Sequence, residues 1–195
     1  MRMVWTILLR MRLWLRGIKT NKCIAEGPVK LDLNSEAKIT LGRNVFFRGN
    51  CELKVRENGL IELGDNVRLD FGVRITVAAD YSIKLHEGVD IGFCSLINGG
   101  EDITIGSGTA LGGHCVIQSS EHIVANNQEI SVVEGNYKRG KISIGKSTWL
   151  ASFVVVRPNV TIGDNTVIGA FSIVNKDIGD AQMAAGIPAA IKKRL

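Results

Sequence analysis

Aliphatic residues recur at every sixth position over the last third of the chain. The series begins at residue 144, has mostly small or polar residues between its members, and consists of Ile144, Leu150, Val156, Ile162, Ile168 and Val174. A helix would repeat near 3.6 residues and a half-buried strand near 2, so neither explains a period of six. The pattern instead predicts a parallel β solenoid in which three six-residue units form one triangular coil.

Two further positions of the six-residue unit support this interpretation. Glycine often follows the aliphatic residue, as at Gly145, Gly163 and Gly169, which suits a corner where the backbone turns sharply. The fifth position is always small or β-branched, so it can point inward beside the aliphatic side chain: Thr148, Val154, Val160, Thr166 and Ser172.

The same signal recurs upstream at coil-sized intervals. The tags KITLG, LIELG, SIKLH, DITIG and KISIG begin at Lys38, Leu60, Ser82, Asp102 and Lys141, with spacings of 22, 22, 20 and 39 residues. The long interval contains NNQEISVVEGNYKRG, which breaks the period. It predicts a loop at about residues 124–140 that projects from the coil stack, and long loops in compact folds are usually functional or disordered.

Composition narrows the class of protein. The 195 residues fit one domain, and 45% hydrophobic with only 6% aromatic residues indicates a core of small aliphatic side chains. Cys51 and Cys115 fall at small inward positions, and the four cysteines show no CxxC spacing, which favours reduced thiols in a cytoplasmic protein over a disulfide or zinc framework. A net charge of +5 is too diffuse to indicate nucleic-acid binding.

Residues 1–22 are predicted to form a basic amphipathic helix. They lack an AxA-like cleavage site and an apolar run long enough to span a bilayer. On a helical wheel, one face holds Val4, Ile7, Met11, Trp14, Leu15 and Ile18, and the basic residues lie away from it. The apolar face could cap the first coil, or residues 1–19 could lie on the anionic inner leaflet of a membrane.

Three C-terminal segments carry a family resemblance: KISIGKSTWLAS, VTIGDNTVIGAFSIVNKDI and AAGIPAAIKKRL. They resemble the hexapeptide-repeat acyltransferases, in the maltose, galactoside and polysaccharide O-acetyltransferase branch, and the resemblance is strong over residues 90–195. It implies a left-handed parallel β-helix over residues 23–195, with a C-terminal tail at 182–195, that commonly works as a homotrimer. It further implies direct acetyl transfer from acetyl-CoA to a hydroxyl of a sugar or polysaccharide precursor, with no metal.

The resemblance assigns the general base to His122, which closes a coil just before the projecting loop. Removing a proton from a sugar hydroxyl needs a base that titrates near neutrality, and imidazole does so without a shifted pKa. Family members usually have proline next, where this chain has Ile123. His86 and His114 are competitors that we expect to be exposed structural residues. A zinc site is the alternative, but His114 and His122 are eight residues apart, whereas the related β-helical carbonic anhydrases use a spacing of five.

Other matched positions imply acceptor and donor contacts. Asn98 corresponds to an asparagine that helps to hold the acceptor or the transition-state oxygen, although an asparagine before two glycines can also simply stabilise a corner. The positions that match the acyl-CoA groove, which the family forms between adjacent subunits, are Trp149, Ala151, Ala170 and Lys176. The flat indole of Trp149 suits packing on the pantetheine arm, and the small side chains of Ala151 and Ala170 leave backbone groups accessible to the ligand. The cations of the C-terminal tail suit contacts with the phosphates of CoA: Lys192, Lys193 and Arg194.

Alternative functions remain open from the sequence. The same chemistry could act on serine, an antibiotic or an amino sugar, because no acceptor motif distinguishes them. A non-catalytic trimeric β-helix scaffold is the alternative from a different class.

Overall fold

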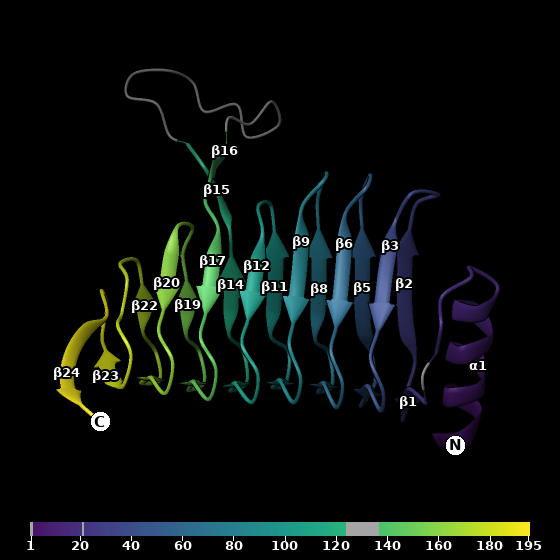
Figure 1. Cartoon of the computed structure of the whole chain (residues 1–195), viewed down its shortest axis with the longest axis horizontal. Coiled ribbons are helices and arrows are strands. Elements are labelled where there is room, and N and C mark those ends of the chain that lie inside the picture. The colour runs from purple at the N-terminus through teal and green to yellow at the C-terminus, as the bar shows by residue number, and fades with distance from the viewer. Residues whose placement is uncertain (1, 21, 124–136) are drawn as a thin grey trace.

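Three parallel sheets run the length of the molecule, and a short helix lies at its N-terminal end (Figure 1). The computed structural model describes residues 2–20, 22–123 and 137–195. Each coil contributes one strand to each sheet in turn, and equivalent strands of successive coils pair in parallel, as Ile83 does with Ile61 and Ile103. The predicted parallel β-helix is confirmed.

The strands are short, and we call the three sheets A, B and C. Sheet A contains β1 (Ile24–Ala25), β4 (Phe46–Phe47), β7 (Arg68–Leu69), β10 (Asp90–Ile91), β13 (Ala110–Leu111), β18 (Trp149–Leu150), β21 (Val167–Ile168), β23 (Gln182–Ala185) and β24 (Ala190–Arg194). Sheet B contains β2 (Val29–Leu33), β5 (Cys51–Val55), β8 (Arg74–Val77), β11 (Leu96–Gly99), β14 (Val116–Gln118), β19 (Val155–Val156) and β22 (Ile173–Val174). Sheet C contains β3 (Lys38–Leu41), β6 (Leu60–Leu63), β9 (Ser82–Leu85), β12 (Ile103–Ile105), β17 (Ile142–Ile144) and β20 (Val160–Ile162). At the C-terminal end, β24 folds back antiparallel on β23.

The six-residue period marks the buried interior, as predicted. All six aliphatic residues of the series from Ile144 to Val174 are at most 1% exposed. Cys51 and Cys115 are buried at the small inward positions and are free thiols. Burying an aliphatic side chain contributes about 1.5–3 kcal/mol, so the stacked interior is the main source of stability.

The glycines after the aliphatic residues have a different role from the one that the sequence suggested. The left-handed turn falls two residues later, at Ser147 and Asn165, whose φ angles are 53°. Gly163 itself does not have a positive φ, but a Cβ there would lie 2.5 Å from the backbone nitrogen of Asp180 on the next coil. Glycine is therefore required at this corner by the close approach of successive coils.

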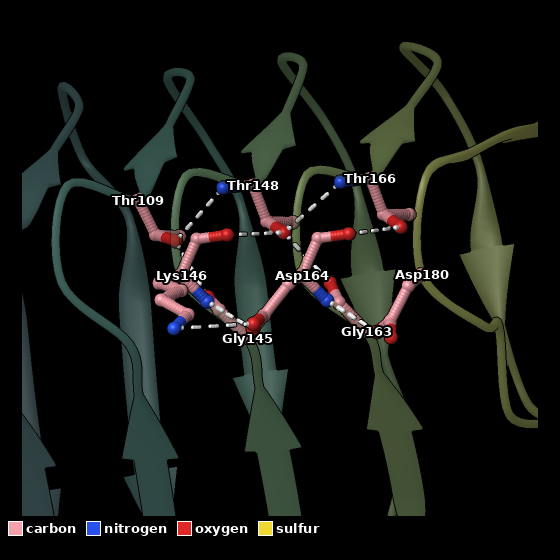
Figure 2. A network of polar contacts seen from close by, with 8 residues as sticks. All are labelled: Thr109, Gly145, Lys146, Thr148, Gly163, Asp164, Thr166 and Asp180. Atoms are coloured by element: carbon pink, nitrogen blue, oxygen red, sulfur yellow. Dashed lines mark hydrogen bonds and ion pairs between the residues drawn. The ribbon is translucent and has the colours of Figure 1, made fainter. Parts of the chain in front are cut away.

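Buried threonines tie these corners together from the inside (Figure 2). The Thr148 hydroxyl donates to the carbonyl oxygen of Gly163 at 2.8 Å and accepts from the backbone N–H of Thr166 at 3.2 Å. Thr109 and Thr166 make the equivalent donations one coil before and one coil after. Each hydroxyl thus links its own coil to the next one, without leaving a buried polar group unpaired.

The predicted loop interrupts this stack between β14 and β17. Most of the segment assigned to it, residues 124–136, lies outside the described residues. On its C-terminal side, Tyr137–Arg139 form a strand, β16, that pairs antiparallel with β15 (Ser120–His122). These two short strands form a hairpin base that leaves the solenoid at the corner between sheets B and C, where Figure 1 shows β15 and β16 rising from the stack.

The N-terminal helix, α1 (Arg2–Trp14), closes the first coil with a face that the helical wheel did not select. Leu9 and Leu13 are buried against the core. Arg10 donates through Nε to the carbonyl oxygen of Cys23 at 3.0 Å, and Arg12 donates through Nη1 to that of Val29 at 2.9 Å. The basic residues point toward the solenoid because the open edge of the first coil presents carbonyl oxygens that need donors.

The apolar face that the wheel selected points mostly to solvent. Of the residues on that face, only Ile18 packs against the core. The others are exposed, as are the flanking Met3 and Leu8: Val4, Ile7, Met11, Trp14 and Leu15. Within the described residues, no helix combines the length and hydrophobicity needed to cross a bilayer.

Replacing Thr148 with valine tests the threonine ladder. The substitution keeps the shape of the side chain but leaves the Gly163 carbonyl and the Thr166 N–H without their partner in a buried corner. We expect the free energy of unfolding, measured by urea denaturation, to fall by about 1–3 kcal/mol. Thr161→Val, the same change at an exposed position of β20, serves as the control and should stay within about 0.5 kcal/mol of wild type. Equal stability of the two variants would contradict the role of the ladder.

Candidate active site

A pocket of about 370 Å³ lies on the outer face of sheet B, which is within the size range of small-molecule sites. Its floor is a row of polar side chains in register on three successive coils: Thr76, Asn98 and Gln118. Asn98 is therefore a pocket residue, as its assignment to the acceptor requires. Gly99 and Gly100 complete the floor, and a Cβ on Gly100 would lie 2.2 Å from the Ser120 hydroxyl, so the second glycine makes room for the hairpin.

The hairpin base forms one wall of the pocket and has two different faces. Cross-strand partners in an antiparallel pair share a face, as do alternate residues of one strand. Ser120 pairs with Arg139, and His122 pairs with Tyr137, so these four side chains share one face. Because Ser120, Tyr137 and Arg139 all line the pocket, His122 is placed on the pocket side of the hairpin.

The opposite face of the hairpin anchors it to the next coil. Glu121 lies on that face and accepts from Arg157, which follows β19, with Nε at 3.0 Å and Nη2 closer. Lys138, the cross-strand partner of Glu121, contributes a weaker contact at 4.0 Å. This anchoring fixes which face of the hairpin is turned toward the pocket.

The imidazole of His122 is exposed and packs against Tyr137, with 4.4 Å between ring centroids and a tilt of 41°. Exposure leaves the ring nitrogens accessible to a ligand. The other two histidines lie elsewhere. His86 is exposed at a corner of sheet C, and His114 stacks at 4.9 Å on Phe153 at the corner between sheets A and B. Within the described part of the chain, no group of three or more possible ligands could hold a metal.

The residues assigned to the acyl donor lie away from this pocket in the same chain. Trp149 belongs to sheet A, where its side chain is 54% exposed. Ala151 and Ala170 lie at the corner between sheets A and B on consecutive coils. The backbone N–H of Ala151 donates a hydrogen bond to the carbonyl oxygen of Ile168 at 2.9 Å. The exposed cations Lys176, Lys192 and Arg194 lie near the C-terminal end of the stack. One chain therefore brings Asn98 and the hairpin together. It does not bring this pocket together with the residues assigned to acetyl-CoA.

Burial makes the inward cysteines poor nucleophiles. It raises the pKa of Cys51 to about 11, and it also raises the pKa values of Cys23 and Cys115. These three thiols stay protonated at neutral pH, whereas nucleophilic attack needs the thiolate. They do not offer a covalent route that would compete with a histidine base.

Sequence reasoning missed the hairpin residues. Ser120, Tyr137 and Arg139 line the pocket, yet Tyr137 and Arg139 fell within the segment that was assigned to a loop. The available signal was weak, because each strand of the hairpin has only three residues and alternation over three residues is common by chance.

The chain is similar to known transferases along most of its length. Residues 141–176 match the family model of the bacterial transferase hexapeptide (six repeats). Over 160 residues the chain is 32% identical to galactoside O-acetyltransferase of Escherichia coli (strain K12), with 79% of this chain and 77% of that protein covered.

Solved structures give the same fold. A maltose O-acetyltransferase from Clostridium difficile 630 superimposes with a TM-score of 0.54 and 26% identity, covering 73% of this chain and 66% of that one. A mutant N-acyltransferase from Bacillus cereus, solved in complex with dTDP-4-amino-4,6-dideoxyglucose and Coenzyme A, gives a TM-score of 0.67 at 18% identity and covers 95% and 88% of the two chains.

Proposed function

This chain belongs to the bacterial hexapeptide-repeat acyltransferases, and we propose that it transfers an acetyl group from acetyl-CoA to a hydroxyl of a sugar or polysaccharide precursor. The observation that carries the proposal is the placement of His122 on the pocket side of the hairpin, beside a pocket lined by amide and hydroxyl groups. The 32% identical relative is by name an O-acetyltransferase of galactosides, which supports a sugar hydroxyl as the acceptor.

In the proposed reaction, His122 accepts the proton of the acceptor hydroxyl as its oxygen attacks the carbonyl carbon of the thioester. The new C–O bond forms while the C–S bond breaks, and the imidazolium returns its proton to the departing thiolate of CoA. Asn98, a neutral donor on the pocket floor, would hold the acceptor or the developing oxyanion. A positioned base contributes about 10²–10⁴ in rate, and the remainder comes from holding thioester and hydroxyl together.

We propose that acetyl-CoA lies along the corner that carries Ala151 and Ala170. Trp149 would pack against the pantetheine arm, and the cations Lys176, Lys192 and Arg194 would contact the phosphates. Because Trp149 and Ala151 lie on sheet A and at its corner with sheet B, whereas the hairpin that carries His122 leaves at the corner between sheets B and C, a neighbouring chain has to supply one half of each site. A homotrimer with sites between adjacent subunits meets this requirement, as closed symmetry repeats one interface three times.

An amino-sugar acceptor is the second candidate. The Bacillus cereus structure, whose protein is by name an N-acyltransferase, favours it, but at 18% identity that likeness shows the fold alone. If the enzyme acetylated the amino group of an amino sugar and none of its hydroxyls, this second candidate would replace the present proposal.

We place the enzyme in the cytoplasm, where its thiols stay reduced, and in contact with the inner leaflet through residues 1–19. The helix α1 caps the solenoid with one face and exposes a band of large apolar side chains on the other. The first 25 residues contain six basic residues and no acidic one. A second copy of this helix would be repelled by that charge, whereas an anionic lipid surface complements it.

The variant His122→Ala tests the base. We expect kcat for acetyl transfer to a galactoside acceptor, followed by thiol release, to fall by about 10²–10⁴. Binding of acetyl-CoA, measured by calorimetry, should not change, because the imidazole is not part of the donor contacts. His86→Ala replaces another exposed histidine and should retain wild-type kcat. Full activity of His122→Ala would remove His122 from the reaction.

Vesicle co-sedimentation tests the contact with lipid. The double variant Met11→Ser and Trp14→Ser removes two exposed side chains from the outer face of α1, so we expect it to fold normally. Its affinity for phosphatidylcholine vesicles that contain phosphatidylglycerol should fall at least about tenfold relative to wild type. Trp149→Ser, at an exposed tryptophan of sheet A, is the control. Unchanged binding of the double variant, or equal wild-type binding to vesicles of phosphatidylcholine alone, would contradict the lipid contact.

A further inference from the structure

We infer that the acceptor sugar carries a negative charge, a carboxylate or a phosphate, and that Arg139 recognises it. This inference rests on the proposed function for the identity of the acceptor site, and it adds a substrate class to it. Its starting point is the charge distribution around the pocket on sheet B.

Cations next to the pocket are paired with carboxylates in almost every case. On sheet B, Lys54 lies 3.3 Å from Asp32, and Arg74 lies 2.8 Å from Glu52. At the hairpin, Arg157 and Lys138 both contact Glu121. Glu52 and Glu121 each contact two cations, so a positive excess remains, but every one of these cations already has a carboxylate partner.

Arg139 differs from these cations. Among the described residues it has no carboxylate partner, and none of the residues that line the pocket is acidic. Its guanidinium carbon lies 5.7 Å from the ring centroid of Tyr81 and 6.0 Å from that of Tyr137, and Nη1 donates to the Tyr81 hydroxyl at 3.4 Å. The two tyrosine rings flank the guanidinium and use one of its N–H groups, which leaves further N–H donors for a ligand.

The position of Arg139 relative to the proposed base makes this cation relevant to the acceptor. Arg139 and His122 share one face of the hairpin, two residues apart along the strand direction, and Tyr137 contacts both of them. A sugar whose hydroxyl reaches His122 from the pocket would therefore have its neighbouring substituents near Arg139. A guanidinium binds carboxylate or phosphate oxygens with two parallel hydrogen bonds, which fixes the orientation of the sugar as well as its affinity.

Three acceptors with the same ring test the inference: methyl galactoside, its uronic acid, and galactose 6-phosphate. We expect wild type to prefer one or both anionic acceptors, and Arg139→Gln to lower kcat/KM for the preferred one by roughly tenfold to a hundredfold through KM. The kcat/KM for the neutral acceptor and the KM for acetyl-CoA should change less than about twofold, because Arg139 binds no anionic group in either case. Comparison of the uronic acid with the phosphate shows which anion is recognised.

Lys138→Gln is the matched control, because it removes a neighbouring cation from the opposite face of the hairpin. Arg139→Lys keeps the charge but loses the planar fork, so its kcat/KM for the anionic acceptor should fall between those of wild type and Arg139→Gln. Equal losses on neutral and anionic acceptors, or a loss confined to acetyl-CoA, would overturn the inference.

Binding of the uronic acid and of galactose 6-phosphate, measured by saturation-transfer NMR without acetyl-CoA, separates this inference from the proposed function. Binding of either anion that is lost in Arg139→Gln and kept in Lys138→Gln would support the anion site even if no acceptor were acetylated, in which case only the proposed reaction would fail. Acetylation of the neutral sugar alone, with no Arg139-dependent binding of either anion, would overturn the inference and leave the reaction in place.

Discussion

Every coil of this protein has to stack in register on the next one. Parallel strands of successive coils lie about 4.8 Å apart, so each buried side chain meets its equivalent one coil away. At the corners the approach is closer still, and a Cβ on Gly145 would lie 2.6 Å from the backbone of Gly163. The interior is therefore filled almost entirely by small and aliphatic side chains, with Phe47 as a buried aromatic exception, and charged or reactive groups have to be placed on the outer faces, at the corners or at the two ends.

The candidate site follows from this constraint. The hairpin leaves the stack at one corner and returns without disturbing the register, because the Gly140 N–H bonds the Ser119 carbonyl oxygen at 3.0 Å and Ile142 pairs directly with Ile103. Strand alternation then gives the hairpin two faces. One face is fixed to the next coil by Glu121, and the other, which carries His122, is turned toward the pocket on sheet B.

The N-terminal end is governed by the same stacking rule. The first coil has no coil before it, so its strand edge presents unpaired carbonyl oxygens and its core would be open to water. The helix α1 supplies Leu9 and Leu13 to the core and guanidinium donors to the carbonyl groups. Its other large apolar residues, such as Met11 and Trp14, are not needed for this purpose and remain exposed.

Much of the fold could be predicted from the sequence, because stacking imposes a strict local rule. The period of six located the buried aliphatic residues, such as Ile162, and the inward position of Cys115. Features that depend on contacts across space could not be predicted in this way. The pairing of His122 with Tyr137 joins residues on either side of a long insertion. The inward face of α1 depends on carbonyl groups of another segment as well as on the burial of Leu9 and Leu13.

The same distinction applies to the site. Asn98 and His122 could be proposed from the sequence because each matches a position that the family resemblance assigns, whereas Arg139 has no place in the repeat. The family resemblance implied a groove between adjacent subunits, but the sheet that each of these residues occupies in one chain became visible only in the structure.

The central claim is that His122 of one chain acts on acetyl-CoA held by Trp149 of its neighbour. Co-expression of His122→Ala and Trp149→Ala chains, each with its own affinity tag, yields mixed oligomers that can be purified and assayed for acetyl transfer. If each site combines two chains, one of the three sites in every mixed trimer regains both residues, and activity should return to about a third of wild type. Mixed oligomers no more active than the parent variants would contradict a site shared between chains.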